Sequence, residues 1–151
     1  MSSSQMPPAP PESPFASARV AHAALRVPDL EASKRWFIDK LDFQVVREWP
    51  VGELRYAWLC PAGGGAFHVE IVGGNAPEPN PEFCTVEETL EYGGYHHVCI
   101  DVAELDRALA ELRRRGVATI GETTDMAGAG RRSAFIADPW GNLVEVAEAT
   151  G

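Results

Sequence analysis

The chain has 151 residues, of which 45% are hydrophobic and 23% charged, a composition that predicts one packed domain or two small modules sharing a core. The formal net charge of −9 argues against nucleic acid and against an anionic membrane surface as partners, because both select basic surfaces. Three cysteines without a CxxC pair favour a reducing compartment over a disulfide scaffold, and no apolar run is long enough to span a bilayer. We therefore expect a cytoplasmic protein.

The chain begins with a segment that predicts a disordered tail, because residues 1–18 are rich in Pro, Ser and Ala and cannot bury enough apolar surface to fold. A first module is expected over residues 19–72. Its periodicity predicts a strand ended by Pro28 and Asp29, a helix, and three further strands, at 19–27, 30–41, 43–49, 54–60 and 66–72.

A connecting loop is expected over residues 73–94, where Thr85 and Glu88 have the spacing of a capping box and Gly93 is placed to end a short helix. A second module over 95–148 repeats the order of the first, with Gly116 as the expected C-terminal cap of its helix. Its elements are expected at 95–102, 104–115, 117–123, 131–137 and 143–148, with a tight turn at 138–142. The predicted fold class is α+β, with two βαβββ modules that pair within or between chains to cover the sheet face each leaves bare.

The sequence repeats itself at one offset. His97 follows His22 by 75 residues and Glu145 follows Glu70 by the same 75, so each copy has a His and a Glu separated by 48 residues. Strand alternation places each of the four on the more polar face of its strand, opposite apolar residues such as Leu25. Repeated packing requires repeated apolar positions, but it gives no reason to repeat a histidine and a carboxylate unless the two copies share a site. We therefore predict a metal centre built by duplication.

Two neutral imidazoles and two carboxylates form a nitrogen and oxygen donor set with two negative charges. This set suits a divalent cation such as Fe, Mn, Co, Ni or Zn, and not Cu(I) or an iron-sulfur cluster. The predicted metal ligands are His22, Glu70, His97 and Glu145. Glu145 or Glu70 is also the expected catalytic base.

Further residues are candidates for substrate contact, each with a plainer structural alternative. His68 lies two residues before Glu70 and shares its face, so it could replace that ligand, carry a proton or line the strand. Strand alternation also allows three aromatic residues to line the cleft: Tyr56, Trp58 and Phe135. Arg131 and Arg132 follow a Gly-rich loop at 128–130, and one of them could meet an anionic substrate group or lie on a solvated face. Buried aromatic residues more often belong to the core. His96 points away from His97 by alternation, which favours a structural role.

These motifs resemble a known family. The run HAALRVPDLEAS from His22, the HVCIDVAELD repeat from His97 and the closing DPWGNLVEV from Asp138 are similar to the vicinal oxygen chelate superfamily, over residues 20–148. That superfamily includes glyoxalase I, methylmalonyl-CoA epimerase, extradiol dioxygenases and antibiotic resistance proteins. The resemblance implies paired βαβββ modules that curl into a mixed-sheet cleft, with metal ligands at the four positions named above, and a homodimer.

The resemblance leaves the reaction open among three classes. The first is proton transfer next to a carbonyl, as in an isomerase, epimerase or lyase acting on a small oxygenated metabolite. The second is an Fe(II) extradiol-type dioxygenase that uses His22, His97 and Glu145 and leaves Glu70 without an evident use. The third is a small-molecule binding or resistance protein. Because all four predicted ligands are present, we rank proton transfer first.

Overall fold

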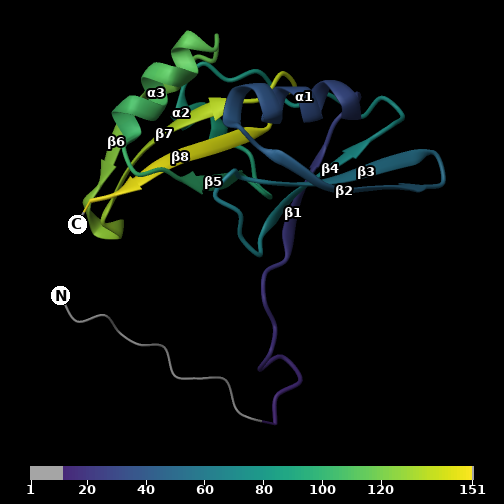
Figure 1. The fold of residues 1–151 in the computed structure, drawn as a ribbon. Coiled ribbons are helices and arrows are strands. Elements are labelled where there is room, and N and C mark those ends of the chain that lie inside the picture. The colour runs from purple at the N-terminus through teal and green to yellow at the C-terminus, as the bar shows by residue number, and fades with distance from the viewer. Residues whose placement is uncertain (1–11, 151) are drawn as a thin grey trace.

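The computed structural model describes residues 12–150 and contains two βαβββ modules in series (Figure 1). The first comprises β1 (His22–Arg26), α1 (Leu30–Leu41), β2 (Gln44–Val51), β3 (Leu54–Cys60) and β4 (His68–Gly73). The short helix α2 (Val86–Thr89) lies in the connecting segment. The second module comprises β5 (His97–Asp101), α3 (Leu105–Arg114), β6 (Ile120–Met126), the 3-10 turn η1 (Ala127–Ala129), β7 (Arg131–Ala137) and β8 (Leu143–Ala149). None of the helices within residues 12–150 is long and apolar enough to cross a membrane.

Most predicted elements are confirmed, and the differences have local causes. The helix predicted at 30–41 is α1, capped by Asp29, whose carboxylate accepts from the Ala32 amide. Strand β2 continues through Pro50 to Val51 because it is an edge strand, where proline is tolerated. The strand predicted from Val117 begins at Ile120 instead, because the Val117 amide completes the C-terminal cap of α3 by donating to the Leu112 carbonyl. Gly116 adopts the left-handed conformation that this cap requires, with a φ of 80°.

The N-terminal tail is described only from residue 12. Residues 12–18 form turns without helix or strand, and most of them are exposed. The disorder predicted for residues 1–11 lies outside the described residues. The first strand is also shorter than expected, since β1 begins at His22 instead of residue 19.

Each module forms one four-stranded mixed sheet, in the order β1-β4-β3-β2 and β5-β8-β7-β6. Strand β1 is parallel to β4, and β5 is parallel to β8, because a helical crossover joins the first strand of each module to the rest. The other neighbouring strands are antiparallel. Figure 1 shows α1 and α3 on the same side of the two sheets, with β1 and β5 near the middle of the molecule.

The two modules pack against each other within one chain. A single cluster of buried apolar residues draws on both, for example Phe37 and Ile71 from the first and Leu105 and Ile136 from the second. At the edge of this core the Arg115 guanidinium, just after α3, donates to both oxygens of the Asp42 carboxylate at 2.8 and 3.0 Å. The two modules therefore share one apolar core within the same chain.

The connecting segment is anchored to the first module where it begins and to the second module a few residues later. The Arg26 guanidinium donates to backbone carbonyls where the segment begins, including that of Asn75 at 2.8 Å. Further on, the Asn80 side-chain amide donates to the Trp140 carbonyl and to the Asn142 side chain, in the turn between β7 and β8. The capping box predicted from Thr85 and Glu88 is present at the start of α2. Gly93 does not end this helix as predicted, because α2 already ends at Thr89 with Leu90 as its C-cap. The segment is thus held against the second module.

Candidate functional site

The structure brings the four predicted metal ligands together as two pairs, one in each module. His22 on β1 lies beside Glu70 on β4, and His97 on β5 lies beside Glu145 on β8. In both sheets the two strands are parallel neighbours. The residue directly opposite the glutamate, Ala24 or Cys99, lies two positions after the histidine on its strand. The same crossover topology therefore explains why both pairs form.

In the first pair, His22 Nε2 lies 3.8 Å from Glu70 Oε1. The other carboxylate oxygen, Oε2, accepts a hydrogen bond of 2.7 Å from the indole N–H of Trp58, which is the cross-strand neighbour of Glu70 on β3. Glu70 is 8% exposed. A buried carboxylate requires such a donor, because losing water without a replacement hydrogen bond is costly.

In the second pair, His97 Nε2 lies 3.1 Å from Glu145 Oε2, and Glu145 is 6% exposed. Burial acts to raise the pKa of Glu145, but hydrogen bonds from the Ser133 and Cys99 side chains, together with His97, outweigh it and hold this pKa below its ordinary value. Partial burial and the hydrogen bond to Glu145 raise the pKa of the Cys99 thiol to about 11. Cys99 is therefore a hydrogen-bond donor here and not a reactive thiolate.

The two pairs suit a divalent cation in their chemistry, although they remain apart. Within residues 12–150 no group of three or more His, Cys, Asp or Glu side chains lies close enough to hold a metal ion. Among the same residues, Glu70 forms an ion pair with His22 and Glu145 forms one with His97. Neither carboxylate forms an ion pair with a Lys or Arg side chain there. Two buried carboxylates that face imidazoles are a set that a divalent cation would neutralise. Binding one ion through all four side chains requires the two pairs to approach each other.

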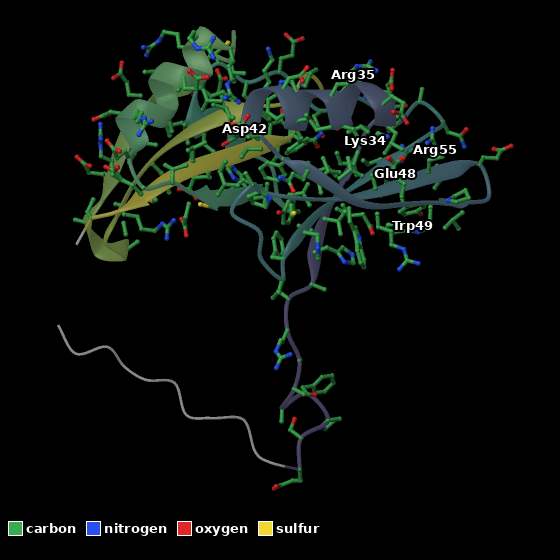
Figure 2. The ribbon with its side chains drawn as sticks, in the orientation of Figure 1. Lys34, Arg35, Asp42, Glu48, Trp49 and Arg55 are labelled. Atoms are coloured by element: carbon green, nitrogen blue, oxygen red, sulfur yellow. The ribbon has the colours of Figure 1, made fainter. Side chains whose placement is uncertain are left out.

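Aromatic rings form a row beside the first pair. Trp49 stacks on Tyr56 with ring centroids 5.6 Å apart and meets the edge of Trp58 at 5.2 Å. Trp58 in turn stacks on His68 at 5.1 Å and lies 5.7 Å from His22. Figure 2 shows Trp49 on the sheet face away from α1, opposite Lys34, Glu48 and Arg55. Tyr56, Trp58 and His68 thus join the ligand pair in an aromatic surface, and Trp49 is a member that sequence reasoning missed.

The surroundings of the second pair are different. Phe135 lies against the His97 ring in an edge-to-face contact at 5.1 Å, and it is the cross-strand neighbour of Glu145. Arg131 forms an ion pair with Asp101, so its charge is already compensated. Arg131 therefore has a structural partner at the position where sequence reasoning considered an anionic substrate group.

His96 lies against His97, contrary to the expectation from strand alternation. The two Nδ1 atoms are 2.8 Å apart, and His96 Nε2 lies 2.8 Å from the Oγ of Thr89 in α2. Alternation does not apply because β5 begins only at His97. Burial and the neighbouring His97 ring lower the pKa of His96. No pattern in the sequence points to Thr89, because its contact with His96 depends on how the connecting segment folds back.

Comparison with known proteins places this geometry in a family. The model of the Glyoxalase/Bleomycin resistance protein/Dioxygenase superfamily matches residues 19–146. The uncharacterized protein YwkD of Bacillus subtilis (strain 168) is 32% identical over 120 residues, which are 80% of this chain and 88% of YwkD. The mitochondrial methylmalonyl-CoA epimerase of Mus musculus is 26% identical over 133 residues, covering 87% of this chain and 73% of the epimerase.

The fold agrees with this match. A glyoxalase family protein from Enterococcus faecalis has a crystal structure that superposes with a TM-score of 0.69 at 23% identity, covering 86% of this chain and 97% of that one. Because the family model spans most of the chain and the two mixed sheets match a solved member, the chain belongs to the Glyoxalase/Bleomycin resistance protein/Dioxygenase superfamily.

Proposed function

We propose that this chain is a divalent-metal-dependent enzyme that moves a proton next to a carbonyl group of a small oxygenated metabolite, as an isomerase, epimerase or lyase. The observation that carries the proposal is the pairing of a buried carboxylate with an imidazole in both modules, Glu70 with His22 and Glu145 with His97. Similarity to methylmalonyl-CoA epimerase supports the choice of reaction class.

In this proposal His22, Glu70, His97 and Glu145 hold the ion. A bound divalent ion supplies Lewis acidity, which stabilises negative charge on a carbonyl oxygen. Glu145 or Glu70 accepts the proton from the carbon next to that carbonyl and returns it. Trp58 holds one oxygen of Glu70 through its indole N–H, and this fixes the orientation of the carboxylate.

The aromatic row formed by Trp49, Tyr56, Trp58 and His68 supports a role in substrate contact. Aromatic surfaces bury apolar parts of a ligand and exclude water from neighbouring polar groups. In our proposal, this row holds the apolar part of the metabolite while its oxygens face the two His–Glu pairs.

The metal part of the proposal is tested by elemental analysis and by titration of metal-free protein with Co²⁺, Zn²⁺, Mn²⁺ and Ni²⁺. We expect one equivalent of ion in the wild type, with binding lost or at least tenfold weaker in H22A, E70Q, H97A and E145Q. H68A is the matched control, because His68 lies on the same face as Glu70 and is the register partner of His22. If H68A loses the ion while E70Q keeps it, His68 replaces Glu70 as ligand.

The reaction part is tested by the exchange of an α-hydrogen with deuterated solvent, followed by NMR, using branched acyl thioesters and α-hydroxycarbonyl compounds. We expect metal-loaded protein to catalyse this exchange and E145Q to slow it by about 10²–10⁴-fold. Protein that exchanges none of these hydrogens, but takes up oxygen with catechols after anaerobic loading with Fe(II), would be a dioxygenase instead. Tight capture of a ligand without turnover would identify a binding protein.

The homodimer that the family resemblance implies is part of the proposal. Light scattering coupled to size-exclusion chromatography tests it, with an expected mass of about twice the 16.4 kDa of the chain.

A further inference from the structure

A cavity of about 290 Å³ lies between the connecting segment and the turn that joins β7 to β8. It is lined by two buried leucines, Leu25 and Leu143, and by three aromatic residues, Phe83, Tyr92 and Tyr95. The described residues that line it include no Asp, Glu, Lys or Arg and none of the four predicted metal ligands. The cavity lies at the lower end of the size range of small-molecule sites, about 300–1,000 Å³, so it suits a small uncharged ligand.

Exposed apolar side chains gather beside this cavity. Leu90, Tyr92 and Tyr95 are 68%, 58% and 63% exposed, and all three lie within residues 90–95. The Tyr92 ring also meets the ring of Phe83 at a centroid distance of 5.6 Å. Exposed apolar side chains that cluster at a cavity mark a binding surface, and aromatic rings favour contact with another flat ring.

A short series of hydrogen bonds fixes the orientation of the Asn80 side-chain amide, which also lines the cavity. The Asn142 side-chain NH₂ donates to the Asp138 carboxylate at 2.8 Å, so the Asn142 amide oxygen faces Asn80. The Asn80 NH₂ donates to this oxygen at 3.2 Å and to the Trp140 carbonyl at 3.1 Å. Both of its hydrogens are therefore used, and the Asn80 oxygen remains as an acceptor.

Close packing holds this side of the cavity in place. A Cβ at Gly141 would lie 3.1 Å from the Asn80 Cβ and 3.4 Å from the Pro81 carbonyl oxygen, and Gly141 has a φ of 79°. Only glycine combines this conformation with so close an approach. The connecting segment therefore rests directly on the turn, and the cavity is formed before any ligand arrives.

The basic side chain nearby has no terminal donor left for an anion. A second cavity adjoins the first, since the two share Leu25, Asn80, Tyr95 and Asn142, and it is also lined by Arg26. The four terminal N–H groups of Arg26 donate to the backbone carbonyls of Val27, Val72, Gly74 and Asn75. A phosphate group on a ligand would therefore find no free guanidinium N–H there, in a chain whose net charge is −9.

We propose that this cavity binds an uncharged heteroaromatic ring that carries an N–H donor, of which a nucleobase is the simplest biological example. The ring lies against the aromatic side chains of Phe83, Tyr92 and Tyr95, and its N–H donates to the Asn80 oxygen. The site is separate from the two His–Glu pairs, and the proposal does not depend on the metal-dependent function.

The experiment is a titration of the ¹⁵N-labelled full chain with two uncharged bases, 9-methyladenine and 1-methyluracil, followed by NMR. We expect dissociation constants of roughly 0.1–10 mM for at least one of them, as befits so small a ligand. The shifted amide signals should concentrate at residues 80–95, while the Trp58 indole N–H signal beside the first His–Glu pair stays unchanged.

Loss of the ligand's N–H groups tests the role of Asn80. The analogue N6,N6,9-trimethyladenine keeps the ring of 9-methyladenine but carries no N–H, so we expect it to bind the wild type about three- to tenfold more weakly. In N80A the two compounds should bind within about twofold of each other. General loosening of the segment would weaken both compounds and leave their ratio unchanged.

Removal of a ring tests the aromatic contact independently of Asn80. Y92A should weaken binding of 9-methyladenine at least fivefold, because it deletes one aromatic wall, and the exposure of Tyr92 means that the fold does not depend on this ring. F15A is the matched control, because Phe15 is an exposed aromatic residue outside the cavity, and it should bind within about twofold of the wild type. Adenosine monophosphate should bind no more tightly than adenosine.

Four results would overturn the proposal. The first is no binding of either base up to about 20 mM. The second is a preference for 9-methyladenine over its trimethyl analogue that persists in N80A. The third is equal affinity of Y92A and F15A for 9-methyladenine. The fourth is binding of adenosine monophosphate tenfold or more tighter than adenosine, which would identify an anion site instead.

Discussion

The hydrogen bond from Trp58 to Glu70 offers a direct test of how the first pair is held. Replacing Trp58 with Phe removes the indole N–H, which lies 2.7 Å from Glu70 Oε2, and leaves an aromatic ring at the position. The Glu70 side chain is only 11% exposed, so water cannot fully replace the lost donor. A hydrogen bond to a carboxylate contributes about 1.5–3 kcal/mol, so we expect W58F to lower the free energy of unfolding by that amount beyond its loss of apolar area.

The control for lost area is W49F, since Trp49 belongs to the same aromatic row and stacks on Tyr56. Urea unfolding followed by circular dichroism measures both variants, and the double variant W58F/E70Q closes a thermodynamic cycle. We expect a coupling energy of about 1–3 kcal/mol between Trp58 and Glu70. Equal losses in W58F and W49F, with a coupling energy near zero, would show that this hydrogen bond does not stabilise the fold.

Three further predictions concern packing, pH and metal. The Cβ of an alanine at Gly73 would lie 2.6 Å from the Leu30 Cβ, so we expect G73A to lower the free energy of unfolding, measured in urea, by about 2–3 kcal/mol. G93A is the control, because its Cβ would meet nothing within 4 Å, and it should change the free energy of unfolding by less than about 0.5 kcal/mol. Hydrogen bonds from Arg114 and Arg115 lower the pKa of Glu111 from 4.5 to about 2, so their contribution to stability is present above pH 4.5 and is lost as the pH falls toward 2. The urea midpoint of the wild type should fall over that range, and E111Q should lose this part of the fall. A metal ion supplied at about 100 times its dissociation constant adds about 2.7 kcal/mol to the free energy of unfolding. We therefore expect the ion to raise the Tm of the wild type by about 5–10 °C and that of E145Q by much less. Equal Tm shifts in the two proteins would exclude Glu145 as a ligand.

Local patterns in the sequence predicted the elements well where a single short-range rule governs them. The helix at 30–41, the capping box at Thr85 and Glu88 and the cap at Gly116 are all confirmed. Each depends on residues within about one helical turn of one another, so tertiary contacts do not alter it. The start of β6 was predicted wrongly because Val117 serves the cap of α3 before the strand begins.

The pairing of histidine with glutamate was also accessible from the sequence, because strand alternation and a constant offset act together. Alternation says which face a side chain occupies, and the duplicated crossover places the first and last strands of each module side by side. Both His–Glu contacts follow from these two facts. The identity of the carboxylate neighbours does not, because Trp58 and Ser133 reach Glu70 and Glu145 from other strands.

What the sequence determined by itself is therefore the pair of βαβββ modules and the four side chains that repeat between them. Tertiary structure decided that the modules pack within one chain, that Arg131 is occupied by Asp101, and that His96 faces Thr89 and His97. These features depend on segments far apart in the chain and on the path of the connecting segment. Periodicity carries no information about such contacts, since it describes only how neighbouring residues share a face.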